Sequence, residues 1–284
     1  IARPALAVIM NIGTMHMAHL GSQEGRRKAK REILEGMAPD ARVILNGDDA
    51  LLRSLEEQPA QPILYFGTDE SLNVYATDIA QDDALHFTAH DDGGDSFPVR
   101  LHVEGTHYVS DALAAVTVGL AMGVSPANIR SGLDCFRNMS GRQEILEAGG
   151  ITFIKDCYNA GPESMEAALK VLGNKPGRRV AVLGDMLELG VCAPAEHYRV
   201  GRLAAAKSDL VFAFGPNAER VVSGCITGGM GQYRAQAFTQ KEKLIAALKR
   251  TLTPGDVVLV KGSHGMHMEQ VVDAFLTVEK KEDK

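Results

Sequence analysis

The first 70 or so residues alternate short apolar runs with longer polar or amphipathic stretches. The apolar runs occupy Ala5–Met10, Arg42–Asn46 and Pro62–Phe66, and each has the length of a buried β-strand. Between them, charged residues recur at helical spacing from Ser22 to about Gly36, and Ala50–Glu57 has the same character. The order strand, helix, strand, helix, strand predicts an α/β fold, with a parallel sheet covered on both faces.

The period of the pattern changes to two between Ser71 and Glu104. Apolar residues alternate with polar ones there, as at Val99, Leu101 and Val103, and the segment Asp91–Asp95 has the composition of a turn. Alternation of this kind is typical of strands with one solvated face. We therefore expect an antiparallel meander at the edge of the same, mostly parallel sheet.

Two apolar-periodic helices follow, at Thr106–Met122 and Pro126–Phe136. Ser125 is placed to cap the second, since a serine before a proline is a common helix start. The helical pattern then stops, and we place a domain boundary within Ser140–Gln143. This divides the chain into residues 1–141 and residues 142–284.

The second part alternates strands and helices throughout. Two short strands, Glu144–Leu146 and Ile151–Lys155, flank a Gly149-Gly150 turn. Further strands are predicted at Arg179–Leu183, Leu210–Phe214, Tyr233–Ala237 and Asp256–Val260, with helices near Pro162, Ala193, Asn217, Gln240 and His267. This order predicts a Rossmann-like α/β domain.

Composition narrows the class of protein. The chain has 284 residues, 45% of them hydrophobic, which suits two domains with buried cores. The net charge of −6 is spread along the sequence without a basic stripe, and Trp is absent, so we expect no nucleic-acid partner. No apolar run reaches the roughly 18 residues that a membrane span needs.

The four cysteines, Cys135, Cys157, Cys192 and Cys225, lie far apart and form neither a CxxC pair nor a Cys/His metal spacing. This favours free thiols in a reducing, cytoplasmic setting. The start, Ile1-Ala2-Arg3-Pro4, has neither an initiator Met nor a signal pattern. The strand that follows needs sheet partners, and we expect them to come from sequence in front of it or from elsewhere.

Two polar turns carry most of the chemical information. Asp156–Met165 and Val182–Gly190 each run from an apolar strand into a turn rich in Gly, Asn, Pro or acidic residues, and then into a helix. The carboxyl ends of parallel strands present ligand-binding groups at one edge of a sheet. We therefore expect both turns to face one crevice.

Together with other segments, these turns resemble the Mur ligases, which are ATP-dependent amino acid and peptide ligases of cell-wall precursor synthesis. The similarity is greatest to the branch that adds D-alanyl-D-alanine, and it runs from Asn11 to about Glu269. Its carriers are Asn11-Ile12-Gly13, His16, Leu20-Gly21-Ser22, Ala29-Lys30-Arg31-Glu32-Ile33, Leu45-Asn46-Gly47-Asp48-Asp49, Gly141-Arg142, the Asp156 turn, Gly184-Asp185-Met186-Leu187-Glu188-Leu189-Gly190 and Val260-Lys261-Gly262-Ser263.

The resemblance implies a metal site in the first part. His16 matches the family's magnesium-associated histidine, and Lys30 matches the lysine that these ligases carbamylate, which turns an ammonium into an oxygen donor suited to Mg²⁺. Both are expected to be catalytic and metal-binding. The residues alone favour a polar loop residue over a metal ligand for His16, and the alternative for Lys30 is a solvated helix lysine like Lys28.

The resemblance also implies an ATP site. Arg142 matches an arginine that reaches ATP phosphates, where it would stabilise charge during phosphoryl transfer. Asp156, Tyr158, Asn46 and Lys261 are further nucleotide-binding candidates. The alternatives are a boundary salt bridge for Arg142 and an exposed strand-end lysine for Lys261, while Asn159 and Ser164 are expected to shape the turn and cap the next helix.

Two weaker groups are interpreted structurally. Asp185 and Glu188 lie three residues apart, and we expect them to cap and solvate their turn. His264 and His267 alternate with Met266 and Met268, but the helix that follows places the methionines in a core, so we reject a soft metal site.

The implied reaction uses ATP and Mg²⁺. The carboxylate of a UDP-muramoyl tripeptide would take the γ-phosphoryl group of ATP, and the amine of D-alanyl-D-alanine would attack the acyl phosphate. Closure of the second domain would bring Asp156 and Lys261 onto the site. We expect a cytoplasmic monomer with these small-molecule partners.

The chain departs from the family pattern at several points. It contains no Gly-Lys dipeptide, so the phosphate loop that ends in Gly-Lys-Ser/Thr is expected before Ile1, and the fragment alone is expected to be inactive. Tyr108 and Asp111 replace two asparagines, Gly161 replaces an asparagine, and His264 replaces an arginine. A non-catalytic descendant that acts as a binding or assembly module, or a ligase for another amino acid, therefore stays open.

Overall fold

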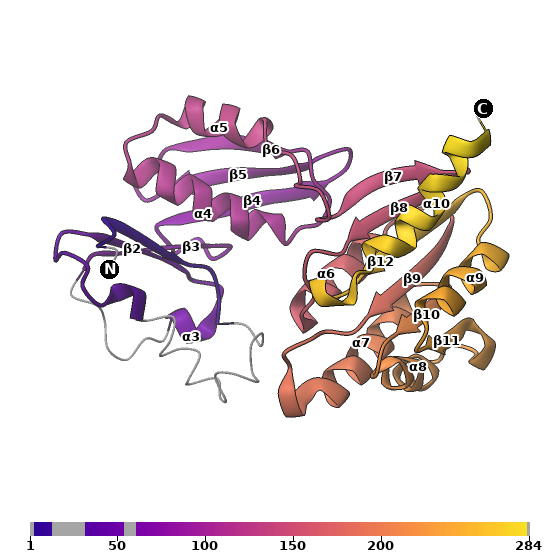
Figure 1. The fold of residues 1–284 in the computed structure, drawn as a ribbon. Coiled ribbons are helices and arrows are strands. Elements are labelled where there is room, and N and C mark those ends of the chain that lie inside the picture. The colour runs from indigo at the N-terminus through magenta and orange to yellow at the C-terminus, as the bar shows by residue number, and fades with distance from the viewer. Residues whose placement is uncertain (1–2, 13–31, 54–60, 283–284) are drawn as a thin grey trace. The chain divides into compact units, whose positions relative to one another are not determined.

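The computed structural model describes residues 3–12, 32–53 and 61–282, with side chains up to Leu276. Its contacts divide the chain into two compact units, and the main chain passes from the first to the second between Arg137 and Asn138. Each unit is built around its own six-stranded sheet (Figure 1).

The sheet of the first unit follows the order of the chain, β1 to β6. The pairs β1–β2, β2–β3 and β3–β4 are parallel, and β4–β5 and β5–β6 are antiparallel. The predicted parallel sheet with an antiparallel meander at its edge is thus confirmed. The strands are β1 (Leu6–Ile9), β2 (Arg42–Asn46), β3 (Ile63–Gly67), β4 (Val74–Gln81), β5 (Leu85–Asp91) and β6 (Ser96–Leu101).

Helices α4 (Tyr108–Ala121) and α5 (Pro126–Asp134) cover one face of this sheet. Alternate residues of β5 and β6 supply the buried side, because successive side chains of a strand point to opposite faces. Ser125 caps α5 as predicted, and its hydroxyl accepts a hydrogen bond from the Asn128 N–H.

The other face of the first sheet packs against residues that precede β2 and against α3 (Ala50–Arg53). The helix expected up to about Gly36 is, in its described part, a 3-10 turn at Glu32–Leu34. The rest of that helix, and the end of the one predicted over Ala50–Glu57, lie outside the described residues.

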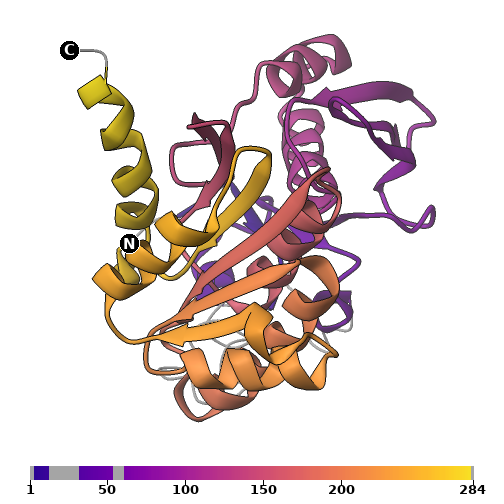
Figure 2. The ribbon, with the colours of Figure 1, turned by 90° about the vertical axis from the view of Figure 1, so that its right-hand side faces the viewer.

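The sheet of the second unit has the order β11-β10-β9-β12-β8-β7. Its strands are parallel except β7, which pairs antiparallel with β8. Figure 2 shows the twist of these strands. The strands are β7 (Glu144–Ala148), β8 (Ile151–Asp156), β9 (Arg178–Gly184), β10 (Leu210–Phe214), β11 (Ala235–Phe238) and β12 (Asp256–Lys261).

Five helices cover both faces of the second sheet. One core contains side chains of α6 (Pro162–Gly173), α7 (Ala193–Lys207) and α8 (Ala218–Thr227), and the opposite core contains side chains of α9 (Lys241–Thr251) and α10 (Glu269–Glu282). The predicted Rossmann-like domain is therefore present.

Several boundaries differ from the prediction by one or two residues, and two of these differences have a visible local cause. The strand expected from Tyr233 begins at Ala235, after a 3-10 turn at Gln232–Arg234. The last helix begins at Glu269, because His267 adopts a left-handed conformation with φ 49° that a continuing helix does not allow.

Candidate functional site

The strand order of the second unit creates a switch point between β9 and β12. β9 leads into α7 on one face, whereas β12 leads into α10 on the opposite face. Ligands of open α/β sheets bind at the carboxyl ends of strands at such a point, because the chains diverge there. The turns after β8, β9 and β12 all lie at this edge, as the sequence predicted.

The two strand ends approach closely at the switch point because β9 ends in Gly184 and Gly262 directly follows β12. A Cβ atom on Gly262 would lie 3.1 Å from the Cα of Gly184 and 2.7 Å from the side chain of Met268. A Cβ atom on Gly184 would lie 2.9 Å from the same methionine. Larger residues at either position would push the two turns apart.

Ser263 joins all three strand-end turns. Its hydroxyl accepts a hydrogen bond from the Leu187 N–H at 2.9 Å and donates to the Ala160 carbonyl at 3.3 Å. Its own N–H donates to the Asp185 carbonyl at 3.1 Å. Ser263 is 4% exposed, so these bonds are shielded from water. Ser263 therefore serves as a connection between the turns.

Lys261 and Asp156 form a buried ion pair across neighbouring strands. The Lys261 ammonium lies 2.7 Å from Asp156 Oδ2 and donates a second hydrogen bond to the Asn159 carbonyl at 3.0 Å. The side chains are 3% and 13% exposed. The alternative of an exposed strand-end lysine is therefore wrong, and the ammonium holds the turn after β8 against β12.

Arg142 and Tyr158 are the exposed members of the predicted nucleotide group. The guanidinium carbon of Arg142 lies 4.2 Å from the centroid of the Tyr158 ring. Tyr158 is 53% exposed and borders a hollow of about 340 Å³. The hollow is lined by Tyr158, Asn159, Leu187, Glu188, Ser263, His264 and Gly265. The structure thus brings Arg142, Asp156, Tyr158 and Lys261 to one region of the second unit.

Helix α6 begins at the turn after β8. Its N-cap is Gly161, and the Ser164 hydroxyl, one turn into the helix, accepts from the Gly161 N–H at 3.0 Å. The Asn159 side chain accepts from the Ala160 N–H at 2.8 Å. Both residues therefore shape the turn and the helix start, as the sequence suggested.

Asp185 has the structural role expected for it, but it is buried rather than solvated. It is 3% exposed and accepts hydrogen bonds from the backbone and side-chain N–H groups of Asn217, which fixes the start of α8. His197, which the sequence did not single out, accepts from the Met186 N–H at 2.9 Å and contacts the Ala193 carbonyl through Nδ1 at 2.6 Å. This bonding places the ring proton on Nδ1.

In the first unit, polar turns also follow the parallel strands. The Asn46 side chain accepts from the Asp48 N–H at 2.9 Å and donates to the Ser110 hydroxyl at 3.3 Å. Asp49 accepts from the Ile12 N–H, which ties the turn after β1 to the turn after β2. Two predicted site residues, His16 and Lys30, lie outside the described residues.

The methionines near the end of the chain are core residues, as expected. Met268 is fully buried, and Met266 packs against the same core. His264 is exposed, and its ring lies 6.1 Å from that of Tyr158.

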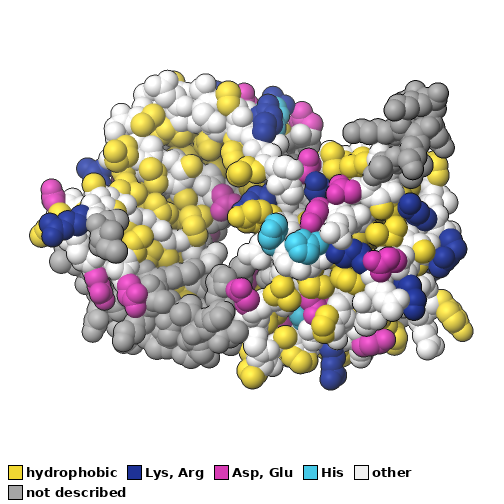
Figure 3. Space-filling view, in the orientation of Figure 1, with side chains coloured by type: hydrophobic (Ala, Val, Ile, Leu, Met, Phe, Trp, Pro, Cys, Tyr) yellow, Lys and Arg dark blue, Asp and Glu magenta, His cyan; other side chains and the backbone are white. Residues whose placement is uncertain are grey.

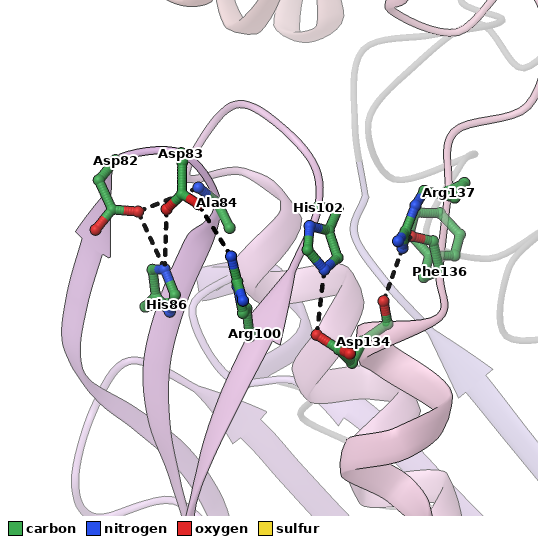
Figure 4. Close-up of polar contacts among 9 residues, drawn as sticks. All are labelled: Asp82, Asp83, Ala84, His86, Arg100, His102, Asp134, Phe136 and Arg137. Atoms are coloured by element: carbon green, nitrogen blue, oxygen red, sulfur yellow. Dashed lines mark hydrogen bonds and ion pairs between the residues drawn. The ribbon is translucent and has the colours of Figure 1, made fainter.

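One other group of possible metal ligands occurs in the part of the chain that the structure describes. Ligand atoms of Asp82, Asp83 and His86 lie within 4.8 Å of one another, at the turn between β4 and β5 (Figure 4). Asp82 contacts His86 at 3.0 Å and accepts from the Ala84 N–H, and Asp83 pairs with Arg100 at 3.0 Å. These contacts make the group part of the hairpin turn.

The distribution of surface charge and the state of the cysteines match what the sequence composition predicted. On the face shown in Figure 3, basic and acidic side chains are interspersed. All four cysteines are free thiols. No helix within the described residues has the length and apolar character needed to cross a membrane.

Known proteins resemble the chain over almost its whole length. The Mur ligase middle domain matches residues 1–119, and the glutamate ligase domain of Mur ligases matches residues 141–264. The UDP-N-acetylmuramoyl-tripeptide–D-alanyl-D-alanine ligase of Bacillus subtilis is 33% identical over 96% of this chain.

Two solved structures share the fold. MurF from Acinetobacter baumannii superposes with a TM-score of 0.85 at 33% identity, over 97% of this chain and 60% of its own. MurF ligase from Thermotoga maritima, solved with ADP, has a TM-score of 0.83 at 24% identity, over 99% of this chain and 64% of its own. The chain spans 59% of the length of the Bacillus relative.

Proposed function

Because this chain belongs to the Mur ligase family, we propose that it acts in the ATP-dependent joining of D-alanyl-D-alanine to a UDP-muramoyl tripeptide. The names of its relatives support this choice of substrates. A cytoplasmic location and a monomeric state belong to the same proposal, and the free thiols suit a reducing compartment.

The observation that carries the proposal is the pair Arg142 and Tyr158 beside the hollow at the switch point. A half-exposed aromatic ring offers a stacking surface, and an exposed guanidinium offers paired donors for phosphate oxygens. These two groups suit a nucleotide, and the Thermotoga relative binds ADP.

The buried residues of the region act on the nucleotide through the turns that they hold. Lys261 and Asp156 satisfy each other, so their contribution is to fix the turn that carries Tyr158. Asn46 holds the turn after β2 in the first unit, and there too the proposed effect on the nucleotide runs through the shape of the turn. The proposal thus gives Lys261 and Asp156 an indirect role, in place of the direct contact with ATP that the resemblance implied.

The chemistry proposed is carboxylate activation followed by amide formation. The tripeptide carboxylate takes the γ-phosphoryl group, and the amine of the dipeptide displaces phosphate from the acyl phosphate. Arg142 would stabilise negative charge on the transferring group. A Mg²⁺ ion held by His16 and carbamylated Lys30 would supply charge neutralisation when bound.

A second candidate is a non-catalytic descendant of the family. It is favoured by His264, which lines the hollow where the family pattern has arginine, and by Tyr108, Asp111 and Gly161. A third hypothesis, which the same four substitutions allow, is a ligase that adds another amino acid.

The test is substrate-dependent phosphate release from ATP by the natural full-length product. Release that requires both the tripeptide and D-alanyl-D-alanine, and that collapses in Lys30→Ala but not in Lys28→Ala, would support the ligase and the metal role together. Absence of release and of ATP binding would leave the non-catalytic descendant. Release with another amino acid in place of the dipeptide would select the third reading.

A further inference from the structure

A single carboxylate oxygen organises the segment that carries Arg142. Glu144 Oε2 accepts hydrogen bonds from the Ser140 hydroxyl at 2.8 Å and from the Gly141 N–H at 2.9 Å. The Lys155 ammonium lies 3.5 Å from the same oxygen. Glu144 and Lys155 are direct partners in the β7–β8 pairing, so the carboxylate is fixed to the sheet.

The charge on Glu144 is stabilised where it lies. Burial raises the pKa of Glu144, but the hydrogen bonds from Ser140 and Gly141 and the charge of Lys155 outweigh burial and leave the pKa below its ordinary value. The carboxylate is therefore ionised at neutral pH, and it accepts charge-assisted hydrogen bonds, which are stronger than neutral ones.

These bonds turn the main chain toward Tyr158. Gly141 has φ +76°, a conformation that favours glycine, and its carbonyl accepts a hydrogen bond from the Tyr158 N–H at 3.1 Å. The next residue, Arg142, then places its guanidinium over the Tyr158 ring. The backbone bond and the ring contact both depend on how the segment Ser140–Arg142 is folded.

We propose that Glu144 is the positioning residue of Arg142, holding the Ser140–Arg142 segment so that the guanidinium stays beside Tyr158. Arg142 and Tyr158 are both exposed, so their ring contact is weak and exchangeable by itself. The anchoring by Glu144 keeps the guanidinium within reach of the ring while leaving it able to turn to a phosphate. The catalytic part of this inference rests on the proposed ligase function.

Glu147 provides a matched control on the same strand. Its carboxylate accepts from the Thr152 hydroxyl at 2.6 Å, a contact within the β7–β8 hairpin that does not involve the segment Ser140–Arg142. A variant that merely loosens the hairpin should therefore behave alike at Glu144 and Glu147.

The experiment measures hydrogen exchange of the Tyr158 amide and, separately, steady-state ligation in the full-length protein. In Glu144→Ala, the Tyr158 amide should exchange at least about tenfold faster than in the native protein, because its acceptor is no longer held. Glu147→Ala should leave that amide unchanged. Glu144→Gln keeps an acceptor oxygen and should recover most of the protection.

In the ligation assay, Glu144→Ala should lower kcat by about tenfold or more with a smaller change in the KM for ATP, since a misplaced Arg142 loses charge stabilisation of the transition state. Equal effects of Glu144→Ala and Glu147→Ala, or an unchanged Tyr158 amide, would overturn the positioning role. If Glu144→Ala does not fold, Ser140→Ala removes one of the two hydrogen bonds and gives the same readout. The exchange measurement tests the anchoring even if the protein proves not to ligate.

Discussion

Removing Asp156 should destabilise the second unit strongly, because it would leave the ammonium of Lys261 buried without its counter-ion. The Lys261 side chain is 3% exposed, and Asp156 Oδ2 lies 2.7 Å from it. Among the described residues, the carbonyl of Asn159 would then remain as the hydrogen-bond acceptor for the ammonium. Asp156→Ala thus tests whether the pair is a structural element.

Breaking a buried pair by removing one partner costs about 3–5 kcal/mol, since the remaining charge stays in a poorly solvated place. Asp156 retains some access to water, with 13% of its side chain exposed, so we expect a loss near the lower end, about 3 kcal/mol. Lys170→Ala is a surface control: its ammonium pairs with Glu166 at 3.0 Å but is 63% exposed, and the loss should be less than about 1 kcal/mol.

The assay is urea unfolding followed by far-UV circular dichroism, since the chain has no Trp. Hydrogen exchange at β8 and β12 amides would assign the transition to the second unit, because the two units can unfold separately. A loss below about 1 kcal/mol for Asp156→Ala would show that Lys261 is solvated in solution and would refute the reasoning.

The double variant Asp156→Leu with Lys261→Met separates structure from ligand contact. Replacing a buried pair by apolar residues of similar size is often neutral, so stability should largely return. If the pair only holds the turn, ATP affinity should return with it. Restored stability without ATP affinity would instead identify a direct phosphate contact by Lys261.

Three further outcomes follow from the geometry. Ser263→Ala should lower stability by about 1–3 kcal/mol, measured by the same urea unfolding, because buried donors and acceptors of two turns lose their partner. Burial raises the pKa of Cys157 to about 12. A thiol reagent at pH 8 should therefore label the exposed Cys135 quickly and Cys157 only after unfolding, and rapid labelling of both would contradict the burial. Hydrogen bonds from Arg179 lower the pKa of Asp209, so the Asp209 carboxylate stabilises the fold above the ordinary aspartate pKa, and this stabilisation is lost as the pH falls through the lowered pKa. Asp209→Asn should therefore lower the free energy of unfolding at pH 7 and have little effect at low pH. An equal effect at both pH values would contradict the ion pair.

Local pattern was sufficient to predict most elements of the fold. β2 matches its predicted range, and β10 begins and ends where the apolar run does, because continuous apolar stretches of strand length are buried on both faces. The start of β11 was predicted two residues too early, since Tyr233 has a strand former's side chain but is 92% exposed in a 3-10 turn. Side-chain preference was misleading there because Tyr233 packs against nothing.

The sequence predicted only part of the contacts at the candidate site, because the hydrogen bonds and ion pairs there join residues that are distant in the chain. Lys261 and Asp156 are 105 residues apart in the chain, and the sequence suggested a nucleotide contact or an exposed strand end for Lys261 but not their buried ion pair. His197 gives no local signal, since its role depends on the turn after β9 lying against α7. The contacts of Glu144 with Ser140 and Gly141 are local in the sequence, but their relation to Arg142 depends on where the fold places Tyr158.

The four residues that depart from the family pattern do not disturb the buried hydrogen bonds and packing that hold the second unit's turns. His264 and Asp111 are exposed, Tyr108 is half-buried against the core of the first unit, and Gly161 adds no side chain at the start of α6. None of these residues brings an unpaired charge into a core. The framework that holds the turns together, including Ser263 and the closely packed Gly184 and Gly262, is complete in this chain.

Selection against misfolding alone would keep the apolar cores but would not require a buried ion pair, because apolar residues of similar size serve stability as well or better. The presence of the pair between Lys261 and Asp156 therefore favours a second unit that uses the shape of its strand-end turns. The departures would then change which groups touch the ligand, whereas Arg142 and Tyr158 lie together where the Tyr158 ring borders the hollow.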